Sequence, residues 1–213
     1  MSIRSVVGAH RVAVVLTAAL VAVAGAPSVW SAEQTIVVVG DSLSSGYGMR
    51  LEHSWVAKLE ARLTTEGYGY EVVNTSISGD TSSGGLARLP QILESIQPAI
   101  VVIELGGNDG LRGQPVNNLK SNLAAMIELT QASGAVAILT GIQIPPNYGP
   151  AYTSAFAAIY PELSAEFDVP LVGFLMDDVA LNDDLMQGDG LHPNERGNDV
   201  MLENVWGVLE ELL

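Results

Sequence analysis

The sequence contains no cysteine among its 213 residues. Disulfides, thiolate nucleophiles and metal sites with cysteine ligands are therefore excluded. Basic residues are also few: nine lysines and arginines stand against 24 aspartates and glutamates, which gives a formal net charge of −15. A surface with this excess of negative charge repels nucleic acid and anionic lipid headgroups, so we expect no nucleic-acid partner. The length suffices for one domain with a hydrophobic core.

The N-terminal segment differs in composition from the rest of the chain. Its few charges are positive and lie within the first eleven residues, an apolar run follows over 12–24, and small residues come next. This order is typical of a secretory signal peptide, and cleavage near Ser31 or Ala32 fits the pattern best. We therefore predict a signal peptide over residues 1–32, a mature domain over 33–213, and an exported protein that is periplasmic or secreted.

An uncleaved membrane anchor is the alternative interpretation of this segment. No charged residue falls between residues 12 and 32, and that length approaches the length of a membrane-spanning helix. Gly25, Pro27 and Ser28 argue against a uniform helix there. We expect no stable membrane insertion after cleavage. The mature chain loses two arginines, which leaves a net charge near −17.

Five apolar, β-branched segments recur along the mature chain, and they are continuous rather than alternating. This pattern is typical of strands that are buried on both faces of a parallel sheet. Segments with helical spacing of apolar residues separate them, and Ser54 is a plausible cap of the first. The alternation predicts right-handed βαβ units in one α/β domain with three αβα layers. The predicted strands cover residues 35–39, 71–77, 99–105, 135–142 and 169–174, and the predicted helices cover 54–63, 86–96, 117–129, 152–167 and 194–212.

Polar segments follow the first three predicted strands. They read G-D-S-L-S at 40–44, S-G-D-T-S at 78–82 and G-G-N-D-G at 106–110. Ligands bind outside the carboxyl ends of strands in open parallel sheets, so these segments are expected to line one site. The first of them could hold a phosphate, form a plain turn, or present a serine as a nucleophile.

Ser42 needs a general base to act as a nucleophile, and the mature chain offers only His53 and His192. His53 precedes a predicted helix and is interpreted as a surface or helix-start residue. His192 lies in D-G-L-H-P, three residues after Asp189. In a turn, Asp189 can accept a hydrogen bond from the near ring nitrogen, which leaves the far nitrogen to take the serine proton. An Asx turn ahead of a helix is the alternative interpretation of this loop.

Attack on a carbonyl creates an oxyanion, which needs fixed hydrogen-bond donors. Gly79 can offer a backbone N–H, Asn108 can offer its side-chain amide, and the N–H of Ser42 is a third candidate. Each also has an ordinary explanation, because glycine and asparagine are common in turns. Asp41 adjoins the serine, and we predict that it braces the loop by accepting bonds from nearby N–H groups.

Taken together and in order, the blocks G-D-S-L-S, N-T-S-I-S-G-D, G-G-N-D-G and D-G-L-H-P resemble the SGNH hydrolases, also called the GDSL esterase family. Three further segments look like its thioesterase I, lysophospholipase and arylesterase branch: N-D-G-L-R-G (108–113), I-P-P-N-Y-G-P-A-Y (144–152) and Y-P-E-L (160–163). The resemblance covers residues 35 to about 210. It implies a flavodoxin-like sheet with strand order 2-1-3-4-5 and no cofactor or metal. It also implies a triad of Ser42, His192 and Asp189 and an oxyanion hole of Ser42, Gly79 and Asn108.

The resemblance further implies a serine esterase that hydrolyses acyl esters and thioesters, such as lysophospholipids and fatty acyl or aryl esters. We expect a monomer whose partner is this small substrate. Three alternatives stay open: a carbohydrate acetylesterase of the same family, a flavodoxin-like binder of phosphate or flavin, and a catalytically silent relative. An acyl groove is predicted at positions that ordinary loop packing would also explain, namely Leu111, Ile144, Pro145, Pro146 and Tyr148.

Overall fold

The computed structural model describes Met1 and residues 34–213, so the predicted signal peptide lies outside the described residues. Five parallel strands form one sheet in the order β2-β1-β3-β4-β5, which confirms the order implied by the family resemblance. Within residues 34–213, no helix has the length and hydropathy that crossing a bilayer requires. The strands are β1 (Gln34–Gly40), β2 (Tyr70–Asn74), β3 (Ile100–Glu104), β4 (Val136–Thr140) and β5 (Leu171–Val172).

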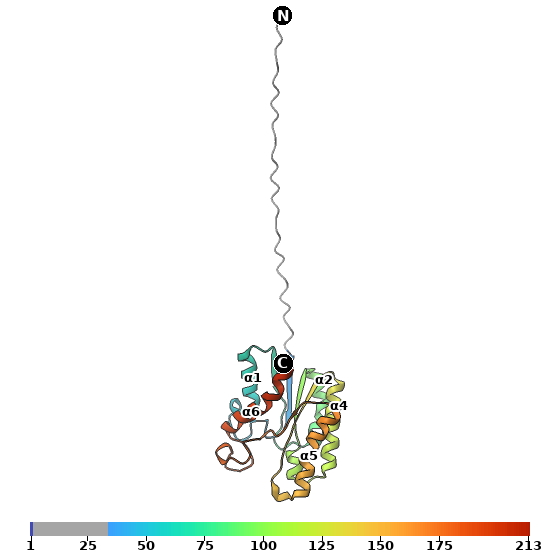
Figure 1. Cartoon of the computed structure of the whole chain (residues 1–213), viewed down its shortest axis with the longest axis vertical. Helices are drawn as coiled ribbons and strands as arrows, with labels where there is room; N and C mark the ends of the chain where they lie inside the picture. The colour runs from blue at the N-terminus through green and yellow to red at the C-terminus, as the bar shows by residue number, and fades with distance from the viewer. Residues whose placement is uncertain (2–33) are drawn as a thin grey trace. The chain divides into compact units, whose positions relative to one another are not determined.

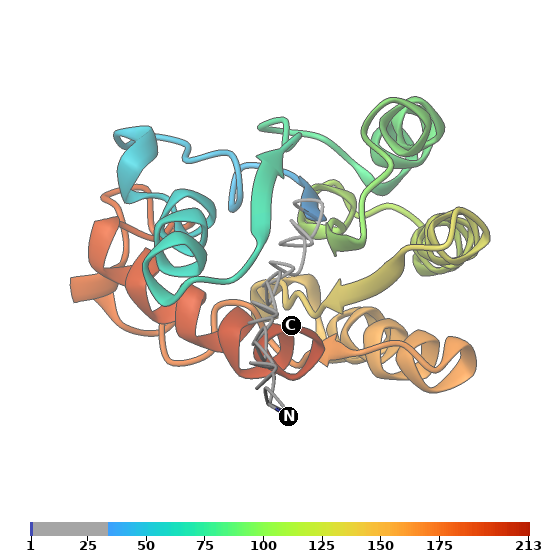
Figure 2. The ribbon, with the colours of Figure 1, turned by 90° about the horizontal axis from the view of Figure 1, so that it is seen from above.

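Helices cover both faces of this sheet and produce the predicted three layers (Figure 1). On one face, α1 (Trp55–Glu66) packs against α6 (Glu195–Leu209). On the other face, α2 (Ser82–Ile96), α4 (Val116–Ala132) and α5 (Pro150–Phe167) lie side by side. Figure 2 shows the strands between these two groups of helices. Short helical turns occur in the connections: η1 (Leu51–His53), α3 (Gly107–Leu111), η2 (Pro146–Tyr148), η3 (Asp183–Leu185) and η4 (Glu210–Leu212).

The central strands β1 and β3 carry continuous apolar runs because both of their faces are covered. Every side chain from Ile36 to Val39 and from Ile100 to Ile103 is at most 2% exposed. Burying each such side chain contributes about 1.5–3 kcal/mol. The residues that follow these two strands therefore rest on the most deeply buried part of the sheet.

Helix α2 begins at Ser82 rather than at the predicted residue 86. The side chain of Thr81 caps it by accepting a hydrogen bond from the N–H of Gly84. Two adjacent glycines conceal this start in the sequence, because glycine disfavours helix interiors. Gly85 leaves room for a neighbouring side chain, since a Cβ at this position would lie 2.2 Å from Cδ1 of Leu105, the residue that follows β3.

Strand β5 is shorter than the predicted segment 169–174. It pairs only with β4. Just beyond this pair, the two backbone segments approach so closely that a Cβ on Gly141 would clash with the carbonyl oxygen of Gly173. The chain leaves the sheet at this contact. The long connection to α6 begins here, and it carries Asp189 and His192.

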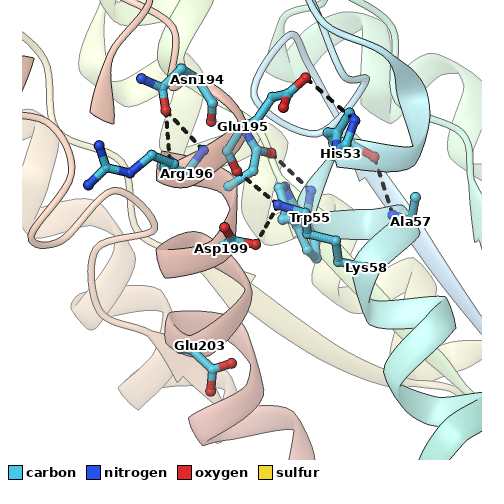
Figure 3. Close-up of polar contacts among 12 residues, drawn as sticks. His53, Trp55, Ala57, Lys58, Asn194, Glu195, Arg196, Asp199 and Glu203 are labelled. Carbon is cyan, nitrogen blue, oxygen red and sulfur yellow. Dashed lines mark hydrogen bonds and ion pairs between the residues drawn. The ribbon is translucent and has the colours of Figure 1, made fainter. Parts of the chain in front are cut away.

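Helices α1 and α6 are joined by polar contacts near their N-terminal ends (Figure 3). The Oδ1 of buried Asn198 accepts a hydrogen bond from the backbone N–H of Trp55 at 2.9 Å. Lys58 Nζ donates to the carbonyl of Glu195 at 2.8 Å and pairs with Asp199. The predicted cap of α1 is also present, because the Ser54 hydroxyl accepts a hydrogen bond within the first turn. The start of α6 is therefore fixed to the start of α1.

Candidate active site

Strand β1 ends at Gly40, and the turn that follows places Ser42 at the carboxyl edge of the sheet. Asp41 Oδ1 accepts the N–H of Leu43 at 3.0 Å, and the Asp41 carbonyl accepts the N–H of Ser45 at 3.0 Å. The turn is therefore closed by bonds to Asp41 on both its side chain and its backbone. This confirms the predicted bracing role of Asp41.

The structure brings together the serine, histidine and aspartate that the sequence analysis selected. His192 Nε2 lies 2.9 Å from Ser42 Oγ, and His192 Nδ1 lies 2.7 Å from Asp189 Oδ2. The other carboxylate oxygen, Asp189 Oδ1, accepts the backbone N–H groups of Leu191 at 2.9 Å and His192 at 3.0 Å. One carboxylate thus holds both the loop and the imidazole that the loop carries.

These contacts determine the ionisation of the aspartate and the tautomer of the imidazole. The backbone N–H of His192, its ring and the N–H of Leu191 lower the pKa of Asp189 to about 2. Because a carboxylate can only accept, the ring proton sits on Nδ1. The Nε2 atom of neutral His192 is then an acceptor that faces the hydroxyl of Ser42.

Gln187 joins the loop of the histidine to the loop of the serine. Its Nε2 donates to the carbonyls of Tyr47 and Pro193, both at 2.9 Å. The ring of Tyr47 lies against the imidazole of His192, with the ring centroids 4.4 Å apart. Neither Gln187 nor Tyr47 was predicted from the sequence as a site residue. The one signal for them is the pair of glycines around Tyr47, which both adopt positive φ in a tight turn.

Gly79 and Asn108 lie beyond β2 and β3, and they line the same cavity as Ser42. Gly79 adopts a φ of 82°, in the region that favours glycine. Asn108 Nδ2 donates to Asp41 Oδ2 at 2.9 Å. Since an amide nitrogen carries two hydrogens, the second can be donated to a group in the cavity. The structure therefore brings all three predicted oxyanion donors to one place.

A buried network fixes the short helix α3 that carries Asn108. The carboxylate of Asp109, which is 1% exposed, accepts the N–H of Ser82 at 2.9 Å and the hydroxyl of Ser82 at 2.6 Å. Asn122 Nδ2 donates to that hydroxyl at 2.9 Å. These bonds tie α3 to α2 and α4. Arg112 Nη2 donates to the carbonyl of Gly79 at 2.9 Å. This bond links the segment that carries Asn108 to the segment that carries Gly79.

A cavity of about 920 Å³ opens beside Ser42. Four of the five predicted groove residues line it: Leu111, Ile144, Pro145 and Pro146. Tyr148 is not part of the lining; its hydroxyl instead donates to the carbonyl of Leu111 at 2.7 Å and supports that wall. A second part of the lining, which comes from the connection between β5 and α6, was not predicted from the sequence. Its apolar members are Phe174, Met176, Ala180, Leu181, Met186 and Leu191.

His53 lies outside this cavity, as its interpretation as a helix-start residue predicts. It ends the turn η1, contacts Arg50, and places Nε2 3.5 Å from Glu195 Oε1 (Figure 3). Across residues 34–213, no group of three histidine, aspartate or glutamate side chains is arranged to hold a metal ion.

Comparison with known proteins decides the family. The model of the GDSL-like lipase/acylhydrolase family matches residues 38–200. The chain belongs to this family. The esterase TesA of Pseudomonas aeruginosa is 51% identical over 183 residues, which cover 86% of this chain and 91% of that protein. An Escherichia coli K12 protein described as thioesterase 1/protease 1/lysophospholipase L1 is 47% identical over 164 residues, 77% of each chain.

A solved structure supports the same assignment. The psychrotrophic esterase EstA from Pseudoalteromonas sp., inhibited by monoethylphosphonate, matches with a TM-score of 0.81 and 40% identity. The match covers 84% of this chain and 98% of EstA. The predicted membership of the SGNH/GDSL hydrolases is confirmed, and this member of the GDSL-like family is a carboxylic ester hydrolase.

Proposed function

We propose that this chain is a serine esterase that transfers an acyl group from an ester or thioester to water through an acyl-enzyme on Ser42. The observation that carries the proposal is the 2.9 Å contact between His192 Nε2 and Ser42 Oγ, with Asp189 on the other ring nitrogen. A serine hydroxyl becomes a strong nucleophile only when an adjacent base can take its proton. This geometry supplies that base in the correct tautomer.

The proposed reaction has two steps with balanced proton transfers. His192 takes the proton of Ser42 as Oγ bonds to the carbonyl carbon. The oxyanion that forms accepts hydrogen bonds from the N–H groups of Ser42 and Gly79 and from the side-chain amide of Asn108. His192 then protonates the leaving alcohol or thiol as its bond to the carbon breaks. Water attacks the acyl-enzyme in the same way, and the free acid leaves. Asp189 orients the imidazole and stabilises its charged form.

The cavity favours an apolar acyl group. Both of its walls carry apolar side chains, from the loop with Ile144, Pro145 and Pro146 and from the connection after β5. Together with the names of the relatives, this supports fatty acyl esters and thioesters, lysophospholipids and aryl esters as substrates. Polar side chains also line the cavity, among them Gln143, Asp177 and Asn182, so a carbohydrate acetylesterase is kept as the second candidate that the substrate panel decides. Membership of a hydrolase family gives no support to the flavodoxin-like binder.

We also infer that residues 1–32 are a signal peptide and that the mature enzyme is periplasmic or secreted. The inference depends on the order of charge, apolar run and small residues near Ser31 and Ala32. Mass spectrometry of the exported protein is expected to find an N-terminus close to these residues. Detection of an intact Met1 on the exported protein would contradict cleavage.

The test of the enzymatic proposal is a panel of esters and thioesters from acetyl to palmitoyl, measured on the wild type and on Ser42→Ala. We expect activity on medium and long chains and a loss in kcat of about 10⁴–10⁶ in the variant. EDTA is expected to have no effect. Retention of most activity by Ser42→Ala would overturn the assignment of the nucleophile. Activity confined to acetyl esters would instead favour the carbohydrate acetylesterase.

A further inference from the structure

Two carboxyl groups are buried directly behind Ser42, and the proposed reaction uses neither as an acid or a base. Asp41 is 2% exposed and Glu104 is fully buried. The sheet register places Glu104, the last residue of β3, beside Gly40 of β1. A Cβ on Gly40 would lie 2.5 Å from Glu104 Oε2, so the glycine leaves room for this carboxyl group. Buried acidic side chains are rare in proteins unless they are paired.

Asp41 determines which way the amide of Asn108 faces. Asp41 Oδ1 accepts from the N–H of Leu43 at 3.0 Å, and Oδ2 accepts from Asn108 Nδ2 at 2.9 Å. A carboxylate can only accept, so a flipped amide would set the oxygen of Asn108 against the oxygen of Asp41. The nitrogen is therefore held in position, and its second hydrogen is available to the oxyanion. Ionisation of Asp41 strengthens this bond, because charge-assisted hydrogen bonds are the stronger kind.

Glu104 supports Asp41 from behind with one oxygen. Glu104 Oε2 accepts the backbone N–H of Asp41 at 3.1 Å and the hydroxyl of Ser44 at 2.7 Å. The other oxygen, Oε1, is buried and has no hydrogen-bond partner within residues 34–213. A carboxylate left in this state beside a second carboxylate would be strongly destabilised. The neutral acid fits this site with its proton on Oε2, shared with Ser44 Oγ at 2.7 Å, and with Oε1 left as an uncharged carbonyl oxygen.

The electrostatics agree with this division of charge. Burial above all, and then the charge of Asp41, raises the pKa of Glu104 well above its ordinary value. Burial raises the pKa of Asp41 only to about 6, because the bonds from Leu43 and Asn108 and the nearby His192 oppose it. At neutral pH the pair then carries one negative charge, located on Asp41.

Other ionisable groups face the pair from neighbouring elements. Asp80 raises the pKa of Asp41, but Asp80 is itself paired with Arg88 at 2.9 Å. Arg88 Nη2 also reaches the carbonyl of Gly40 at 3.4 Å. On α5, the buried hydroxyl of Tyr160 donates to the carbonyl of Leu105 at 3.1 Å, and its pKa lies well above the ordinary value. None of these contacts supplies a partner to Glu104 Oε1.

We propose that Asp41 and Glu104 form a positioning pair for the oxyanion hole. Ionised Asp41 holds the Asn108 amide with its nitrogen toward the oxyanion. Neutral Glu104 holds the backbone of Asp41 and the hydroxyl of Ser44 without adding a second negative charge near a site where negative charge develops. This inference rests on the proposed esterase function and assigns two residues that act through Asn108 rather than on the substrate.

The test compares two isosteric variants, Asp41→Asn and Glu104→Gln. Asp41→Asn removes the charge that orients Asn108, so we expect kcat to fall about 10- to 100-fold with KM nearly unchanged, below the 10²–10³-fold typical of losing an oxyanion donor. Glu104→Gln keeps an uncharged acceptor for the N–H of Asp41, so we expect a smaller loss of kcat than in Asp41→Asn, whereas Glu104→Ala removes that acceptor and should lose kcat as far as Asp41→Asn does. Equal losses in Asp41→Asn and Glu104→Gln would overturn the division of charge, and a wild-type kcat in Glu104→Ala would overturn the positioning role of Glu104. Circular dichroism and thermal unfolding check that all of these variants are folded.

A double-mutant cycle separates positioning from general support of the fold. If Asp41 acts through Asn108, then Asp41→Asn added to Asn108→Ala lowers kcat by less than about threefold further. A full additional loss, or a wild-type kcat in Asp41→Asn alone, would overturn the inference. Ser42→Ala keeps the two proposals distinguishable. If Ser42→Ala is active, the esterase mechanism is refuted. If Ser42→Ala is inactive and Asp41→Asn has the kcat of the wild type, only the positioning pair is refuted.

Discussion

Asn198 joins the two helices that cover one face of the sheet, and replacing it with alanine is expected to destabilise the protein. Its Oδ1 is the acceptor for the backbone N–H of Trp55, the first residue of α1, at 2.9 Å. The truncation leaves that buried N–H without a partner, which costs about 1–3 kcal/mol. It also removes the 3.0 Å bond from Asn198 Nδ2 to the carbonyl of Asn194, which contributes about 0.5–1.5 kcal/mol.

The expected total for Asn198→Ala is a loss of about 3 kcal/mol in the free energy of unfolding. For a domain of this size, each kcal/mol lowers Tm by about 2–4 °C, so Tm should fall by roughly 6–12 °C. Urea and thermal unfolding followed by circular dichroism measure both quantities. Asn204→Ala is the matched control, because half-buried Asn204 lies on the same helix and donates only to the carbonyls of Leu175 and Asp177. Equal losses in the two variants would refute the argument from the buried N–H.

Three further predictions concern the loops and charges of the site. Gln187→Ala removes the link between the serine loop and the histidine loop. We expect kcat to fall about tenfold, while the free energy of unfolding changes by only about 1 kcal/mol. Steady-state kinetics measures the first quantity and urea unfolding the second. Gly40→Ala should lower the free energy of unfolding by about 1–3 kcal/mol, because its Cβ would displace the carboxyl group of Glu104. Unfolding measurements that match the wild type would contradict this packing. Folding raises the pKa of Asp41 from 3.8 to about 6, so the folded state binds this proton more tightly than the unfolded state does. The protonated side chain therefore stabilises the folded state at low pH, and this contribution is lost as the pH rises from about 4 to above 6. Relative to Asp41→Asn, the wild type should lose about 3 kcal/mol over that range, measured by urea unfolding at each pH; parallel pH profiles would exclude Asp41 as the titrating group.

The sheet could be predicted because both of its faces are buried, which forces continuous apolar runs such as Ile36 to Val39. Asp189 and His192 were also accessible to sequence analysis, since they lie three positions apart in one loop. The start of α2 was not, because two glycines conceal a helix that the side chain of Thr81 caps. The end of β5 was not either, because it depends on the close approach of Gly141 to Gly173, which is distant in the sequence.

The same limit explains which residues of the site the sequence conceals. Gln187 reaches a carbonyl 140 positions away, and Asn198 caps a helix 143 positions away. Glu104 stands at the end of an apolar strand, where no local pattern reveals that its carboxyl group bonds the backbone of Asp41 and the hydroxyl of Ser44. Such roles depend on contacts that exist only after the sheet and its helices have assembled.

The hydroxyl of Ser42 and the imidazole that faces it are 150 positions apart in the chain. The serine is synthesised early, whereas the imidazole comes just before α6, the helix that packs against α1. Under the proposed mechanism, a growing polypeptide that has not reached residue 192 therefore lacks the base that Ser42 requires. Ester cleavage is then expected only from a chain whose C-terminal segment has been made and folded, so activity would serve as a readout of complete folding.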